Sequence, residues 1–99
     1  MHMPLAPNET VLNGNWVFEN GHMRGDALEN RIGWLTSEML VQVANHPEYG
    51  TWEILYRDPT DGRYWELTYP QSGMQGGGPK QLRVLALQEA SAKYRMDLK

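Results

Sequence analysis

The sequence predicts an α+β fold: a small antiparallel sheet of about four to five strands, one long helix packed on one face, and a short C-terminal helix. Three patterns predict it. Residues 51–57 and 63–69 are rich in aromatic and β-branched residues, residues 26–45 repeat apolar positions every three or four residues, and residues 81–87 alternate. With 99 residues, 40% of them hydrophobic, the chain can form one domain with a modest core.

The first predicted strands are short. Residues 10–18 form a strand candidate that Asn13-Gly14-Asn15 interrupts with a turn or bulge. Asn20-Gly21 is the strongest short turn signal in this region, and residues 22–24 follow as a brief second strand.

The longest predicted element is a helix from Asp26 to about Asn45. Asp26 can cap the helix, Glu29 follows three residues later as in a capping box, and His46-Pro47 ends it. Its apolar stripe consists of Leu28, Ile32, Leu35, Met39 and Val43. We expect this helix to pack across the sheet.

Residues 51–57 and 63–69 predict a β-hairpin around Asp58-Pro59-Thr60-Asp61-Gly62. If Asp58 pairs with Arg63, the turn residues suit their positions. The opposing pairs are then Trp52 with Tyr69, Ile54 with Leu67, and Tyr56 with Trp65. This register buries both tryptophans on one face. The other face, which we expect toward solvent, carries Glu53, Leu55, Arg57, Tyr64, Glu66 and Thr68.

The C-terminal third continues the sheet. Pro70 ends the second hairpin strand, and a glycine-rich loop covers 71–79. Residues 81–87 predict another strand, and a short helix runs from Gln88 to about Lys93 or Met96.

Candidate chemistry is sparse. The chain has no cysteine, its three histidines show no metal-ligand spacing, and the triglycine at 76–78 lacks the lysine of a phosphate loop. The carboxylate pairs Asp58/Asp61 and Glu53/Glu66 suit turn capping or a polar sheet face better than acid–base catalysis, which needs a cleft. We therefore predict no catalytic residue, no metal and no cofactor.

Charge is unevenly distributed along the chain. Residues 1–66 carry ten acidic and four basic side chains, whereas residues 67–99 carry two acidic and five basic ones. An acidic body disfavours nucleic-acid binding and favours a basic partner, although ordinary solubility explains the same charges. No apolar run is long enough to span a membrane.

The segment D-P-T-D-G-R-Y-W-E-L-T-Y-P-Q-S-G-M-Q-G-G-G-P at 58–79 resembles the signature of the bacterial immunity protein 27 family. N-E-T-V-L-N-G-N-W at 8–16 and W-E-I-L-Y at 52–56 resemble the same family, so the likeness covers residues 8 to about 95. It implies a cytoplasmic antidote of a polymorphic toxin system, used in competition between bacteria. Such a protein binds the C-terminal domain of its cognate toxin and occludes the active or substrate-binding surface.

From this resemblance and the acidic charge we expect a monomer that binds a toxin domain with a basic cleft. The predicted partner-binding residues are Glu53, Arg57, Asp58, Asp61, Arg63, Tyr64, Glu66 and Gln71. The alternative function is a small peptide- or ligand-binding accessory domain without catalytic activity. We expect one domain over 1–99, with residues 1–7 flexible and partly derived from a cloning tag.

Overall fold

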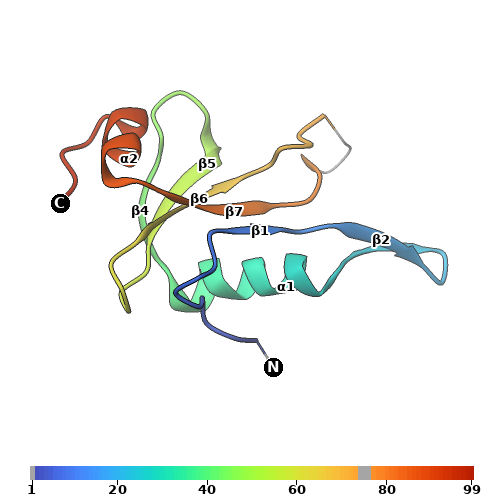
Figure 1. Cartoon of the computed structure of the whole chain (residues 1–99). Coiled ribbons are helices and arrows are strands. Elements are labelled where there is room, and N and C mark those ends of the chain that lie inside the picture. Colours follow the sequence, from blue (N-terminus) through green and yellow to red (C-terminus); the bar gives the residue numbers. More distant parts are fainter. Residues whose placement is uncertain (1, 74–76) are drawn as a thin grey trace.

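A computed structural model gives the fold and describes residues 2–73 and 77–99 (Figure 1). Met1 and the middle of the predicted glycine-rich loop, residues 74–76, lie outside the described residues. In chain order, the elements are β1 (Val11–Asn13), β2 (Trp16–Glu19), β3 (His22–Gly25), α1 (Ala27–Trp34), a π-helical turn (Leu35–Met39), β4 (Val41–His46), β5 (Gly50–Arg57), β6 (Tyr64–Thr68), β7 (Gln81–Leu85) and α2 (Leu87–Tyr94).

The main sheet has five strands, all antiparallel, in the order β1-β7-β6-β5-β4. Strands β2 and β3 pair separately and form a two-stranded ribbon that projects beyond the main sheet (Figure 1). The α+β class and the antiparallel sheet are therefore confirmed. None of the helices in the described part of the chain is long and apolar enough to cross a membrane.

Two cores form because successive residues of a strand point to opposite faces of the sheet. The core under α1 gathers Leu12, Ile32, Leu35, Leu40, Ile54, Tyr56, Trp65, Leu67 and Leu82. The core under α2 gathers Leu55, Tyr64, Leu85, Ala90 and Tyr94. The sheet is thus covered by a helix on each face.

The prediction of one long helix over 26–45 is wrong. Helix α1 ends at Trp34, the π-helical turn follows, and the backbone becomes extended at Leu40, with φ −89° and ψ 148°. The hydroxyl of Thr36 donates back to the carbonyl of Ile32, a contact that competes with regular helix bonding. Residues 41–46 instead add an edge strand to β5, where backbone pairing and the β-branched Val41 and Val43 favour extended structure.

Residues of the predicted apolar stripe pack on opposite faces of the sheet. Ile32 and Leu35 pack in the core under α1, whereas Val43 packs against the core under α2. The helical spacing of Val43 was therefore coincidental. The predicted start of the helix is correct, because the Asp26 carboxylate accepts a hydrogen bond from the Glu29 N–H at 2.8 Å.

The predicted hairpin register is confirmed. Ile54 pairs with Leu67 and Tyr56 with Trp65 across β5 and β6. Asp58 and Arg63 close the turn through a backbone hydrogen bond of 2.9 Å. Strand β6 ends at Thr68, so the third predicted pair, Trp52 and Tyr69, meets only through the rings, edge to face at 5.3 Å.

Burial corrects the predicted faces of this hairpin. Trp65 is fully buried, but Trp52 is 52% exposed and lies outside both cores. On the face that the sequence placed toward solvent, Tyr64 and Glu66 are buried, because α2 and the C-terminal residues pack over it. The periodicity of one hairpin does not reveal that a later helix will cover its polar side.

The N-terminal segment, part of which the sequence predicts to be flexible, is bound by two arginines. Arg31 donates to the carbonyls of Met3 and Pro4 and to both carboxylate oxygens of Glu9. Arg63 donates to the carbonyls of Ala6 and Glu9. These contacts tie residues 3–9 to α1 and to the hairpin turn.

The ion pair between Glu9 and Arg31 makes stability depend on pH. Hydrogen bonds from Arg31 lower the pKa of Glu9 from 4.5 to about 2. The charged carboxylate therefore stabilises the fold above pH 4.5, and this contribution disappears as the pH falls toward 2. We expect the difference in unfolding free energy between wild type and Glu9→Gln to shrink over this range, measured by urea unfolding. A difference for Glu9→Gln that stays constant over this range would contradict the prediction.

Candidate functional site

An open groove of about 640 Å³ lies at the ends of β5, β6 and β7 that are remote from the β5–β6 turn. Its floor comes from one face of the sheet, where Glu53 pairs with Thr68, Thr68 with Gln81, and Glu66 with Arg83. The remaining lining residues are Tyr49, Trp52, Tyr69, Pro70 and Ser72. The groove therefore combines a charged floor with an aromatic rim.

The exposed indole of Trp52 is held in place from two sides. Its ring meets that of Tyr69 edge to face, and a Cβ built on Gly77 would lie only 3.0 Å from it. Gly77 has φ +90°, a conformation that glycine adopts without strain. Because any side chain at residue 77 would displace the indole, part of the glycine-rich loop serves as a seat for Trp52.

Glu66 is the centre of a buried polar network beneath the floor. Its carboxylate accepts a hydrogen bond from the Tyr94 hydroxyl at 2.8 Å, and it pairs with Lys93 at 2.8 Å and with Arg83 at 3.3 Å. Glu89 also pairs with Arg83, at 3.6 Å. Three donors therefore satisfy a carboxylate that is fully removed from water.

This network shifts two pKa values. Burial raises the pKa of Tyr94, and the Glu66 carboxylate, which accepts a hydrogen bond from its hydroxyl, raises it further. Burial opposes the charged form of Lys93, but hydrogen bonds and charge from Glu66, with help from Glu53, outweigh it and raise its pKa. Lys93 therefore remains a cation and Tyr94 a hydrogen-bond donor at neutral pH.

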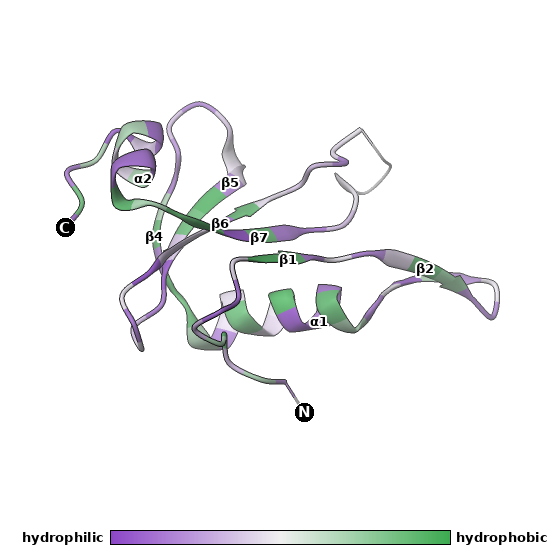
Figure 2. Cartoon of the chain, viewed as in Figure 1, coloured by the Kyte–Doolittle hydropathy of each residue, from purple (hydrophilic) through white to green (hydrophobic). Residues whose placement is uncertain are grey.

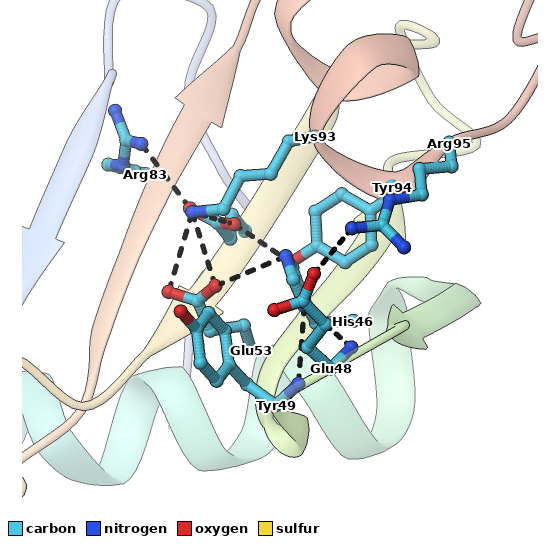
Figure 3. Close-up of polar contacts among 9 residues, drawn as sticks. His46, Glu48, Tyr49, Glu53, Arg83, Lys93, Tyr94 and Arg95 are labelled. Carbon is cyan, nitrogen blue, oxygen red and sulfur yellow. Dashed lines mark hydrogen bonds and ion pairs between the residues drawn. The ribbon is translucent and has the colours of Figure 1, made fainter.

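Glu53 is much less well satisfied than Glu66. It accepts one hydrogen bond, of 3.4 Å, from Lys93 on Oε2. Its Oε1 lies 3.4 Å from the same ammonium and 3.9 Å from His46 Nε2, and it accepts no hydrogen bond. His46 Nδ1 accepts from the backbone N–H groups of Glu48 and Tyr49, so the proton of the neutral ring is on Nε2 and faces Glu53 (Figure 3).

The structure brings together only part of the predicted partner-binding set. Glu53 and Glu66 line the groove, and Gln71 lies beside it, between the lining residues Pro70 and Ser72. Tyr64 is buried, and its hydroxyl donates to the carbonyl of Lys99 at 3.2 Å. The binding role of these residues remains a prediction.

The other four predicted residues are at the opposite end of the hairpin. Asp58 is buried and caps the turn by accepting from the Thr60 N–H at 2.8 Å. Asp61 pairs with Arg63 at 2.7 Å, and the hydrogen bonds and charge of this arginine outweigh burial and lower the pKa of Asp61. The Arg63 guanidinium also lies over the Trp65 ring. The side chains of Asp58, Asp61 and Arg63 therefore stabilise the turn. The side chain of Arg57 is exposed and makes no hydrogen bond to a described residue.

Sequence reasoning missed the aromatic rim of the groove. Trp52 was assigned to the core because its position alternates with Ile54 and Tyr56, and Tyr49 was not considered. The available signal was aromatic residues at strand ends beside a glycine-rich loop. Arg83, which lines the groove from β7, and Lys93, which reaches Glu53 and Glu66 from α2, were also missed because both are distant in sequence from the hairpin.

A second exposed feature is the β2–β3 ribbon. Phe18 is 73% exposed and pairs across the ribbon with the exposed Met23. Figure 2 shows hydrophobic residues along β2 of this projecting element. Its base is anchored by the Trp16 indole N–H, which donates to Glu29 at 3.0 Å.

The described residues contain no group of three or more His, Asp or Glu side chains that could hold a metal ion. In comparison with known protein families, residues 18–86 of the chain match the model of the family described as immunity protein 27. The match extends from the projecting ribbon to β7 and includes every strand that forms the groove. No curated protein and no solved structure matches the chain.

Proposed function

The chain belongs to the immunity protein 27 family, and from this premise we propose that it neutralises a cognate bacterial toxin domain by binding it through the groove and covering its active or substrate-binding surface. The observation that carries the proposal is the half-exposed Trp52, seated on glycine at the mouth of a charged groove. A large aromatic side chain left exposed while fixed in place is typical of a protein-binding surface.

The groove has the composition of an interaction hot spot. Trp, Tyr and Arg dominate binding energy at protein interfaces, and the groove contains Trp52, Tyr49, Tyr69 and Arg83. Because the indole is already held by Tyr69 and Gly77, little side-chain entropy is lost when a partner covers it. A stable complex would bury roughly 800 Å² of this protein, so we expect the contact to extend beyond the groove.

The polar groups of the groove support binding rather than catalysis. Glu66, Lys93, Arg83 and Tyr94 bind one another, so a general acid or base would first have to break this network. We propose a non-catalytic monomer that acts in the cytoplasm, where a toxin that enters or is made in the cell would attack it.

Electrostatic attraction supports a basic partner. The formal net charge is −3, and residues 1–66 carry most of the acidic side chains. Several carboxylates already have partners, as Glu9 does in Arg31 and Glu29 in Lys80. We therefore propose that the overall negative charge accelerates association with a basic toxin cleft, while the groove provides the specific contact.

The test is co-expression with the toxin domain encoded by the neighbouring upstream gene, followed by pull-down, binding titration and a growth-protection assay. Trp52→Ala should weaken binding by at least about tenfold, the cost of removing an interface hot spot. Phe18→Ala is the matched control, because it removes an exposed aromatic side chain on the remote ribbon and should bind like wild type. Thermal unfolding verifies that both variants fold.

Two results would contradict the proposal in different ways. If the wild-type protein neither binds nor protects against that toxin, the function is wrong. If it protects and Trp52→Ala protects equally well, the function stands and the groove is the wrong surface; loss of binding in Phe18→Ala alone would place the contact on the ribbon.

A further inference from the structure

The groove contains a carboxylate whose hydrogen-bonding capacity is unfilled. The Glu53 side chain is partly exposed and has one long hydrogen bond, from Lys93 to Oε2, whereas its Oε1 is buried and accepts none. By contrast, Glu66, which binds the same ammonium, has the additional donors Tyr94 and Arg83. A carboxylate has about four acceptor positions, and a partly buried one is stabilised when donors fill them.

The same network carries an excess negative charge. It contains three carboxylates, on Glu53, Glu66 and Glu89, and two cations, on Lys93 and Arg83. His46, which faces Glu53, accepts two backbone hydrogen bonds on Nδ1, a geometry that leaves no proton on this nitrogen, and the neighbouring pair of Glu48 and Arg95 adds no net charge. One further cation beside Glu53 would balance the charge of the network.

Aromatic rings border this carboxylate in the groove. Tyr49 is 57% exposed and lines the groove together with Trp52, Tyr69 and Glu53. Aromatic faces attract cations, and a guanidinium does so while keeping its N–H groups free for a carboxylate. Aromatic rings beside a carboxylate with unfilled acceptor positions can recognise the guanidinium group of arginine.

We propose that the groove is a receptor for a single arginine side chain of the toxin, whose guanidinium packs on the exposed rings and donates to the Glu53 carboxylate. This inference rests on the proposed function for the identity of the partner. The preference for a guanidinium is a property of the groove and can be measured without the toxin. In this proposal, Trp52 and Tyr49 stack on the guanidinium, and Glu53 recognises its charge.

The test uses a small probe with the complete protein. Nα-acetyl-arginine amide is titrated into ¹⁵N-labelled protein while the indole N–H signal of Trp52, assigned with Trp52→Phe, is followed by NMR. We expect a saturable shift with the arginine compound and none with Nα-acetyl-citrulline amide, which has the same shape without the charge. Glu53→Gln should weaken arginine binding by at least about fivefold.

Glu38→Gln is the matched control, since Glu38 is an exposed carboxylate outside this network that does not line the groove, and it should bind the probe like wild type. Equal binding of the citrulline compound, no saturable shift, or an unchanged affinity in Glu53→Gln would each overturn the inference. Toxin protection separates the two proposals. If protection depends on Trp52 but the groove shows no preference for the arginine compound, the proposed function stands and the arginine site is wrong. If the groove binds the arginine compound but the protein does not protect against the toxin, the arginine site stands and the proposed function is wrong.

Discussion

Glu66→Ala is expected to lower the free energy of unfolding by about 3 kcal/mol, the lower end of the cost of breaking a buried ion pair. Glu66 is fully buried, and its removal deprives the Tyr94 hydroxyl of its acceptor. Lys93 and Arg83 retain Glu53 and Glu89 as partners and are partly exposed, which keeps the cost at this lower end. Urea unfolding followed by tryptophan fluorescence measures the change.

Two further variants identify the cause. Glu66→Gln retains an acceptor for Tyr94 and most of the volume, so it should cost less than Glu66→Ala. Glu89→Ala breaks an exposed ion pair of the same network and should change stability by no more than about 1 kcal/mol. If Glu66→Ala is as stable as Glu89→Ala, the buried network does not stabilise the fold as we describe.

Gly78→Ala is expected to cost at least about 2 kcal/mol, because an alanine would be held in a left-handed conformation that it rarely adopts. Gly78 has φ +76°, and a Cβ there would lie 2.4 Å from the carbonyl oxygen of Gln71. Backbone atoms cannot move aside as a flexible side chain can, so the loop itself must shift. Since Gly77 next to it seats Trp52, toxin binding should weaken as well.

Gly73→Ala provides the control within the same loop. A Cβ at Gly73 meets no atom of the described residues within 4 Å, so this variant should unfold within about 0.5 kcal/mol of wild type. Chemical unfolding measures both variants, and the indole N–H signal of Trp52 in the NMR spectrum of the folded protein reports whether its seat has moved. Equal stability of the two variants would mean that the loop adapts to the added methyl group.

The sequence predicted the register of the β5–β6 hairpin correctly but failed at the end of α1. In the hairpin, a turn with strong positional preferences and a period-two pattern agree on one register, and every contact is between near neighbours. At residues 35–46 the apolar spacing fits a helix and a strand equally well. Pairing with β5 decides in favour of the strand, and that strand is formed by residues that come later in the chain.

The candidate site was predicted only in part, because it also depends on contacts between residues that are distant in sequence. Glu53 and Glu66 were chosen from the polar face of the hairpin, and both do line the groove. Asp58, Asp61 and Arg63 were chosen with them because they are close in sequence, yet the hairpin carries them to its opposite end. Trp52 was assigned to the core because its alternation with buried neighbours does not reveal that β6 ends at Thr68, before it can cover the indole.

Local pattern was therefore sufficient for the fold class, the hairpin register, the helix cap at Asp26 and the resemblance to a toxin-antidote family, since each depends on residues close together in the chain. The division of the polar residues into buried network and exposed groove depended on packing between distant elements. Lys93 and Tyr94 arrive from α2 and Arg83 from β7, and together they convert Glu66 from an expected surface carboxylate into the centre of a buried network. Such contacts form only when the whole chain has folded, because no short segment contains both partners.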